Sequence, residues 1–357
     1  MKYLNALNLI SGVGSKKIEL LLNYFEKPQN IWESDLPNLK ASGVGEKLAE
    51  RILEEKGNIH PEAEWEKLQR EKIEMLTLTD KSYPQLLREI HRPPYILYKR
   101  GKLDLNSGVM IGIVGSRKYS SYGAQATASL SRDLSHAGIV VVSGLAIGVD
   151  TIAHRAAIED QSPTIAVLGS GLDEENIYPR CNLNLAHEII ETGAILSEYP
   201  AGSPATNITF PARNRIIAGL TRGTLVTEAG EKSGALITAK YALEYNRDIF
   251  AIPGSIFSPT SLGVNSLIKS GAKLVSSARD ILEELDFVLE KKESTLPKVP
   301  ETKEEEIIIK VLSNDPTHID KLAILTKLET MTVSSTLSMM EIKGWVKNVG
   351  GQNYIIT

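Results

Sequence analysis

The residues best suited to bind a ligand in this 357-residue chain follow a short apolar run, where Gly112-Ile-Val-Gly115 continues into Ser116 and Arg117. A strand that ends in a glycine turn before a helix directs backbone N–H groups and the positive helix end at an anion. Arg117 adds a permanently charged, planar guanidinium that suits phosphate oxygens. The spacing is not the G-x-G-x-x-G dinucleotide fingerprint. The sequence therefore predicts a phosphate-binding turn, and a purely structural turn with a surface arginine is the alternative.

Two further glycine-rich turns follow neighbouring apolar runs, Val142-Ser143-Gly144-Leu-Ala-Ile-Gly148-Val-Asp150 and Leu168-Gly169-Ser170-Gly171-Leu172-Asp173. In an open parallel sheet, ligands bind beyond the carboxyl ends of the strands. Three such turns at one edge favour a ligand site over three unrelated tight turns. His154 follows the second turn, on a helix expected over residues 150–158. We expect it to be a hydrogen-bonded packing histidine rather than a base.

The densest group of candidate residues is Phe210-Pro-Ala-Arg213-Asn214-Arg215, at an expected helix start. Bases of a single strand stack on an aromatic face without sequence readout, while nearby cations hold the backbone. The alternative is that Arg213 and Asn214 bond loop carbonyls and Phe210 fills the core. We expect at least one of these residues to have that structural role.

The composition describes an ordinary soluble protein, with 42% hydrophobic, 24% charged and 6% aromatic residues. No segment reaches transmembrane length and no secretory signal is recognisable at the N-terminus, so we expect a cytoplasmic protein without membrane insertion. The single cysteine, Cys181, excludes an intramolecular disulfide and a multi-cysteine zinc site. We expect no metal and no cofactor. The net charge of −4 argues against coating nucleic acid by bulk electrostatics, so any such contact must be local.

Short apolar runs alternate with helical stretches from about residue 109, which predicts a parallel sheet with helices on both faces. The expected strands of this doubly wound α/β domain are Val109 to Val114, Ile139 to Val142, Thr164 to Leu168, Ala194 to Leu196, Thr224 to Thr227 and Ile249 to Ile252.

Smaller units flank this core. Residues 1–70 are expected to form a helical domain, in which Gly12-Val-Gly14 recurs as Gly43-Val-Gly45 before a second helical pattern. The extended core is expected over residues 71–288, and within it the proline- and aromatic-rich stretch 80–101 is interpreted as a packed connector that leads into the α/β domain. Residues 289–306 are polar and lack apolar periodicity, which indicates a linker. Three helical patterns and a hairpin around Gly350-Gly351 then predict a winged helix over 307–357.

The run from Asp80 to about Leu285 resembles the DNA-processing protein DprA (Smf) family. The resemblance rests on many ordered motifs, namely D-x-x-Y-P, P-P-x-x-L-Y-x-x-G, I-V-G-S-R, S-G-L-A-x-G-x-D-x-x-A-H, V-L-G-x-G-L-D with Y-P-x-x-N, S-E-Y-P-x-G, F-P-A-R-N-R-I-I-A-G-L, E-A-x-x-x-S-G-A-L-I-T-A and I-P-G. It implies a Rossmann-like, mostly parallel core, a small all-α helix-hairpin-helix (SAM-like) N-terminal domain and a C-terminal winged helix. One departure is Asn207, at a position where some relatives have a lysine.

The same resemblance implies a binding protein without catalytic residues. Its core would form a homodimer, bind single-stranded DNA and load the RecA recombinase onto incoming strands during natural transformation. The implied DNA-binding residues are Gly115, Ser116, Arg117, Ser143, Gly144, Arg180, Phe210, Arg213, Asn214 and Arg215. The winged helix is expected to contact protein or to be vestigial, because its predicted recognition helix is rich in Ser, Thr and Met.

Two other functions fit the same fold. One is hydrolysis of the base–sugar bond of nucleoside monophosphates with Glu228 as the catalytic carboxylate. Enzymes of that class resemble a P-G-G-x-G-T-x-x-E pattern, and here Arg222-Gly-Thr-Leu-Val-Thr-Glu228 lacks the double-glycine turn. The other is a nucleotide sensor whose ligand signals through the winged helix. The helix-hairpin-helix-like domain and the winged helix that flank the core resemble DNA-binding motifs and would be unexplained in a nucleotide hydrolase. We therefore favour DNA binding.

Overall fold

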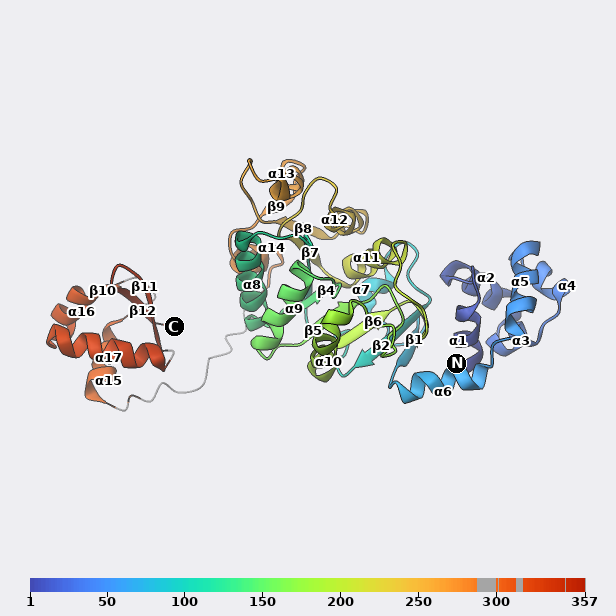
Figure 1. Cartoon of the computed structure of the whole chain (residues 1–357), viewed down its shortest axis with the longest axis horizontal. Coiled ribbons are helices and arrows are strands. Elements are labelled where there is room, and N and C mark those ends of the chain that lie inside the picture. Colours follow the sequence, from blue (N-terminus) through green and yellow to red (C-terminus); the bar gives the residue numbers. More distant parts are fainter. Residues whose placement is uncertain (288–299, 301, 313–316, 344, 357) are drawn as a thin grey trace. The chain divides into compact units, whose positions relative to one another are not determined.

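The computed structural model describes residues 1–287, 300, 302–312, 317–343 and 345–356. They form two compact units, one within residues 1–288 and the other within residues 289–357 (Figure 1). The linker predicted over residues 289–306 lies mostly outside the described residues. Its last part differs from the prediction, because helix α15 (Lys303–Val311) already begins at Lys303. Thr302 caps this helix by accepting the backbone N–H of Glu305, and acidic side chains in the first turn favour the positive helix end.

Residues 1–287 contain one nine-stranded sheet. Its strands are β1 (Glu74–Thr77), β2 (Ile96–Gly101), β3 (Met110–Val114), β4 (Val140–Ser143), β5 (Thr164–Val167), β6 (Ala194–Ser197), β7 (Gly223–Val226), β8 (Asp248–Ala251) and β9 (Lys273–Leu274). They lie in the order β1-β2-β6-β5-β4-β3-β7-β8-β9. The pairs β1–β2 and β2–β6 are antiparallel and all other pairs are parallel, which confirms the mostly parallel core.

Part of the predicted connector is a strand of this sheet. Proline and aromatic residues in the stretch 80–101 masked the apolar run Ile96-Leu-Tyr, whose three side chains are all buried in β2. Strand β2 pairs with both β1 and β6 and so extends the sheet beyond the parallel strands. Part of the connector therefore belongs to the sheet itself and does not only pack against it.

Helices cover both faces of the sheet (Figure 1). Alternate residues of a strand point to opposite faces, so Ile111 and Ile113 pack against α8 (Ser121–His136), α9 (Val149–Glu159) and α14 (Ala278–Glu284). On the other face, Met110 and Val114 pack with α7 (Gln85–Arg88), α11 (Thr209–Leu220), α12 (Ala235–Glu244) and α13 (Leu262–Lys269). Helix α10 (Leu183–Thr192) precedes β6, and two short 3-10 helices span Arg180–Asn182 and Pro259–Ser261.

The N-terminal helices are α1 (Lys2–Leu9), α2 (Ser15–Phe25), α3 (Pro28–Glu33), α4 (Leu36–Ala41), α5 (Glu46–Lys56) and α6 (Pro61–Arg70). Each Gly-Val-Gly joins two helices, α1 to α2 and α4 to α5, and its first glycine has a positive φ, 87° at Gly12 and 83° at Gly43. Glycine alone adopts this left-handed conformation freely. The helices share a hydrophobic core with β2 and with the loops of the sheet, so they belong to the same compact unit.

The second unit is a small winged helix, as predicted. Helices α15, α16 (Ile319–Thr326) and α17 (Thr330–Ile342) enclose a common apolar core. Strands β10 (Thr317–His318), β11 (Val346–Gly350) and β12 (Asn353–Ile356) form a sheet in the order β10-β12-β11. In the described parts of both units, every helix is too short or too polar to cross a membrane.

Candidate nucleic-acid interface

The turn predicted to bind phosphate lies at the end of β3, in the middle of the sheet. Strand β3 is flanked by β4 and β7, where the chain order of the parallel strands reverses. Such a switch point opens a crevice at the carboxyl ends of the strands. A side chain at Gly115 would place Cβ 2.6 Å from Val149, and one at Gly148 would place it 2.5 Å from the carbonyl oxygen of Ser116. The turns after β3 and β4 therefore pack directly against each other, and both need glycine.

A pocket of about 670 Å³ opens at this switch point. We call it the binding pocket. Its wall carries the exposed cations Arg117, Lys118 and Lys232. Other lining residues are Gly115, Ser116, Asp150, Asn207, Phe210, Pro211, Arg213, Asn214 and Thr260.

Arg117 and Phe210 form the most distinctive pair of the binding pocket. The guanidinium carbon of the exposed Arg117 lies 5.4 Å from the ring centroid of the half-buried Phe210. The exposed ring of Tyr178 extends this surface, 5.7 Å from the Phe210 ring and tilted by 42°. A cation and aromatic rings at one pocket edge offer a charge for a phosphate and faces for stacked bases.

Arg213 has the structural role considered above. Its side chain is only 4% exposed, and Nη1 donates to the carbonyl oxygens of Gly144, at 2.7 Å, and Val167. Burial lowers the pKa of Arg213 to about 10, with the charge of Asp150 opposing the shift, so the guanidinium stays protonated at neutral pH. Arg213 therefore holds the ends of β4 and β5 together at the pocket floor.

Asp150 and His154 lie behind the same turns. Asp150 accepts the backbone N–H groups of Gly144 at 3.1 Å and Ala146 at 3.3 Å, and burial raises its pKa against the opposing charge of Arg213. His154 is fully buried, with Nδ1 2.8 Å from the hydroxyl of Thr164. Burial, and secondarily the charge of Arg213, lowers the pKa of His154 to about 3. A histidine that remains neutral inside the fold is a packing residue, as expected.

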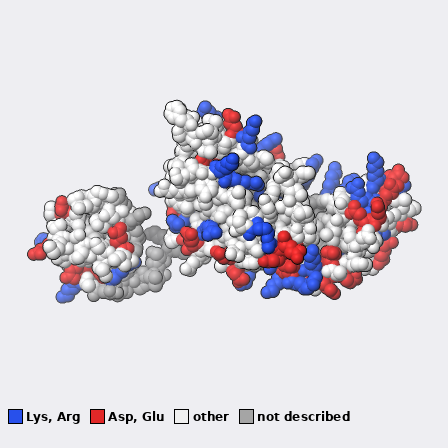
Figure 2. All heavy atoms as spheres, in the orientation of Figure 1, with Lys and Arg blue, Asp and Glu red and all other residues white. Residues whose placement is uncertain are grey.

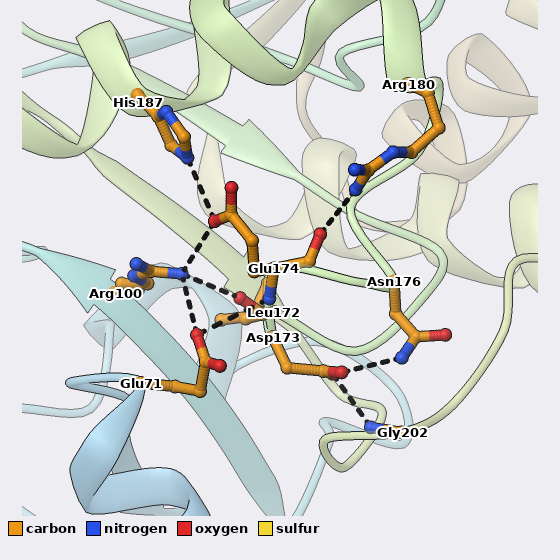
Figure 3. Close-up of polar contacts among 9 residues, drawn as sticks. All are labelled: Glu71, Arg100, Leu172, Asp173, Glu174, Asn176, Arg180, His187 and Gly202. Carbon is orange, nitrogen blue, oxygen red and sulfur yellow. Dashed lines mark hydrogen bonds and ion pairs between the residues drawn. The ribbon is translucent and has the colours of Figure 1, made fainter.

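Three residues expected at the DNA lie outside the binding pocket. The Ser143 side chain is fully buried and its hydroxyl donates to the carbonyl oxygen of Ile113 at 2.6 Å. Arg180 donates to the carbonyl oxygen of Glu174 at 2.5 Å, in a polar cluster with Arg100 and His187 that Figure 3 shows. The backbone of Gly144 shapes its turn, and a side chain there would collide with the guanidinium of Arg213.

Arg215 also lies elsewhere. It forms an ion pair with Glu198, and Nη1 donates to the carbonyl oxygen of Arg92 at 3.1 Å. Successive residues of a helix point about 100° apart, so Asn214 faces the binding pocket while Arg215 faces a second cavity. Asn214 and Arg215 are adjacent in the sequence and were predicted to act together, but α11 directs their side chains into different cavities.

The pocket contains functional candidates that the sequence reasoning missed. Lys118 follows Arg117 directly, and Lys232 lies in the loop after β7, so both were visible as lysines after strand ends. They supply positive charge near Asn207, which lines the same pocket in place of a cation. On the face drawn in Figure 2, basic and acidic side chains are interspersed, which agrees with a local rather than a bulk electrostatic contact.

The carboxylate proposed for a hydrolase is engaged elsewhere. Glu228 is 3% exposed, accepts the backbone N–H of Ser120 at 2.9 Å and takes a hydrogen bond from the hydroxyl of Thr260. It is not a lining residue of the binding pocket. Glu228 therefore stabilises the loop that follows β3, and its carboxylate is not free at this position.

A family model described as DNA recombination-mediator protein A matches residues 74–286, and one described as the DprA winged helix domain matches residues 292–352. A Synechocystis protein named Smf is 37% identical over 99% of this chain and 98% of its own length.

Two solved structures share the fold. The X-ray structure of DNA processing protein A (DprA) from Streptococcus pneumoniae has a TM-score of 0.68 and 37% identity, and the match covers 80% of this chain and 98% of that one. DNA processing protein A from Helicobacter pylori, described with a unique single-stranded DNA binding mode, has a TM-score of 0.54 and 31% identity over 60% of this chain and 95% of its own.

Proposed function

The chain belongs to the DprA (Smf) family of DNA-processing proteins, and we propose that it binds single-stranded DNA in the binding pocket without breaking a bond. The observation that carries this proposal is the guanidinium of Arg117, exposed and 5.4 Å from the Phe210 ring at the switch point of the sheet. Support also comes from the single-stranded DNA binding described for the Helicobacter pylori relative.

The binding pocket separates backbone contacts from base contacts. Arg117, Lys118 and Lys232 hold phosphates, while Phe210 and Tyr178 offer stacking faces to bases. Stacking and phosphate contacts tolerate every base, so binding is independent of sequence. A duplex hides its base faces and is bound more weakly. Of the expected DNA-binding residues, Gly115, Ser116, Arg117, Phe210 and Asn214 contact the strand, while Ser143, Gly144 and Arg213 fix the pocket.

A homodimer through the core joins two binding pockets. Strand β9 ends the sheet, and Leu274 on this edge is 49% exposed. The loop after β8, the strand that pairs with β9, exposes Ile256 by 74% and Phe257 by 89%. An unpaired strand edge and exposed apolar side chains are both typical of an interface between chains. Two pockets on one dimer then bind a long strand with a higher effective concentration.

The biological role follows from the family. We propose that the chain acts in the cytoplasm, protects incoming single strands and loads the RecA recombinase onto them during natural transformation. The description of the matching family as a recombination mediator supports this assignment. The winged helix contacts protein, because its helix α17 exposes Met331 by 83% and Ile342 by 80% and contains no arginine.

The test is fluorescence anisotropy with an oligothymidine strand and a matching duplex at two salt concentrations, for the wild type and Arg117→Ala. We expect tight binding of the single strand, weak binding of the duplex, and a large loss in Arg117→Ala. Arg155→Ala removes an exposed arginine on α9 outside the pocket and is the matched control. Equal binding by Arg117→Ala and Arg155→Ala would contradict the proposal, and tight binding of nucleoside monophosphates instead would favour a sensor or hydrolase.

A further inference from the structure

A second and larger cavity, of about 1170 Å³, lies between the first helical hairpin and the core. We call it the hairpin cleft. One wall is the turn Gly12–Gly14 with the start of α2, and the opposite wall is formed by the loop after β6 and by the end of α12. Figure 1 shows α2 on the side of the core that carries α11. The first Gly-Val-Gly therefore faces the core, whereas the second does not line this cavity.

The hairpin cleft adjoins the binding pocket along its core wall, which consists of the loop after β6 and α12. On α12, Thr238 lines the binding pocket and Tyr241, about one helical turn later, lines the hairpin cleft. On the loop after β6, Pro204 lines the cleft and Asn207 the pocket. The same two chain segments thus border both cavities.

The charges of the hairpin cleft suit a phosphate backbone. Lys16, Lys67 and Arg92 line it, and none of them forms an ion pair with another described residue. The acidic lining residues are Glu64, Glu198 and Glu244, of which Glu198 is paired with Arg215 and Glu244 lies 3.9 Å from Lys240. In the part of the chain that the structure describes, Lys16, Lys67 and Arg92 thus have no carboxylate within ion-pair distance.

Two aromatic rings, those of Tyr241 and Tyr245, line the hairpin cleft together with these cations. Tyr241 and Tyr245 are stacked, with ring centroids 6.0 Å apart and an angle of 16° between planes. Both are half-buried residues of the cleft. Bases of a single strand stack on such rings while cations hold its backbone, which is the same combination that the binding pocket offers.

The hairpin is fixed to the core, so the cleft exists before a ligand binds. The Tyr98 hydroxyl of β2 donates to Asn5 of α1 at 2.7 Å. The backbone N–H of Tyr95 donates to the hydroxyl of Ser15 at 2.9 Å, at the start of α2. A preformed site costs less ordering on binding than a flexible one.

From this geometry we infer that single-stranded DNA continues from the binding pocket into the hairpin cleft. Its phosphates contact Lys16 and Lys67, and its bases stack on Tyr241 and Tyr245. The inference rests on the proposed function, and it gives the N-terminal helices of the same protomer a direct part in holding the strand. It also predicts that one protomer holds more nucleotides than the binding pocket alone accommodates.

The experiment measures dissociation constants of the full chain for oligothymidines of about 4 to 16 nucleotides, the range that single-strand-binding folds occupy. The test variant is Lys16→Gln with Lys67→Gln. The matched control is Lys47→Gln with Arg70→Gln, which removes two exposed cations of α5 and α6 that lie outside the cleft. Lys47 follows the second Gly-Val-Gly as Lys16 follows the first.

We expect the test variant and the wild type to bind the shortest strands equally. For the longest strands we expect the test variant to bind about tenfold more weakly, and the slope of log K against log salt to fall by about 1.4, because each phosphate contact on a single strand contributes about 0.7. The control variant should follow the wild type at every length.

The outcomes separate this inference from the proposed function. If strands bind and the gain of affinity with length is the same in both variants, the hairpin cleft is not part of the track and the binding pocket stands. If no strand binds the wild type, both proposals fail. As a second readout, a long strand with 5-iodouracil bases should photocrosslink to Tyr241 or Tyr245, and crosslinks confined to the binding pocket would overturn the inference.

Discussion

The guanidinium of Arg213 lies 2.7 Å from the carbonyl oxygen of Gly144, although only 4% of the arginine is exposed. A hydrogen bond to Val167 ties the same cation to the end of the next strand. Asp150 accepts the N–H of Gly144 and offsets the buried charge. One buried cation therefore fixes two strand ends beneath the binding pocket, while Arg117 above them is free to meet a ligand.

Arg213→Met is expected to lower the free energy of unfolding by about 3 kcal/mol or more. It leaves two buried carbonyls without a donor and Asp150 without its compensating charge. Arg117→Met removes an exposed guanidinium and should change the free energy of unfolding by less than about 0.5 kcal/mol. Urea unfolding of both variants measures the difference, and similar small effects would contradict the structural role of Arg213.

The sequence predicted the parallel strands and the glycine turns because their signals are local. Apolar runs followed by glycine specify a strand and its turn within a few residues, as at Gly115. Burial of a polar side chain is decided by residues far along the chain, and Arg213 reaches Val167, which no local pattern indicates. The position of Arg215 outside the binding pocket was not predictable for the same reason, because its partner Glu198 comes from the loop after β6.

Some candidate residues of the site were not predicted from the sequence, because their placement depends on spatial neighbours. Lys232 is distant in sequence from the turn after β3, and only the order of β3 and β7 in the sheet brings it to the same pocket. Tyr178 belongs to the Y-P-x-x-N motif, but its contact with Phe210 depends on how the loop after β5 folds. The hairpin cleft is formed where the N-terminal helices pack against the core, and the sequence does not indicate that these two parts are in contact.

Phe210→Ala is expected to weaken oligothymidine binding by about 1 to 3 kcal/mol, the range for loss of one stacked base. Phe210→Trp keeps an aromatic face beside Arg117 and should retain most of the affinity. Anisotropy titrations at constant salt measure both constants. If Ala and Trp weaken binding equally, the ring fills space and does not stack on a base.

Lys118→Ala and Lys232→Ala should each reduce the salt dependence of binding. A phosphate contact on a single strand contributes about 0.7 to the slope of log K against log salt, so each variant should lose about that amount. Lys102→Ala removes a lysine that is 73% exposed and lies outside the pocket, and its slope should equal that of the wild type. A slope that is unchanged in Lys232→Ala would exclude this lysine from the phosphate contacts.

His154 makes stability depend on pH in a defined direction. Its pKa is about 3 in the folded protein and 6.5 in a model peptide, so between these values the unfolded chain binds one more proton. Stability is therefore complete above about pH 6.5 and falls by about 1.4 kcal/mol per pH unit as the pH decreases toward 3.

The variant His154→Asn isolates this contribution. The Thr164 hydroxyl donates to Val141, so it accepts from Nδ1 of His154, and an asparagine amide can replace that donor. Urea unfolding between pH 7 and pH 4 is expected to show a shallower loss of stability in the variant. Parallel curves for the two proteins would mean that His154 is protonated inside the fold.

Phe257→Glu combined with Leu274→Glu is expected to make the protein monomeric in sedimentation equilibrium. Both side chains are exposed, and burying a carboxylate in an apolar interface is strongly unfavourable. Binding of short oligothymidines should be unchanged, because each pocket is complete within one protomer. Long strands should bind about a hundredfold more weakly, since the second pocket no longer contributes to avidity. Tyr24→Glu, at an exposed aromatic residue of α2, is the control, and a double variant that stays dimeric would place the interface on another surface.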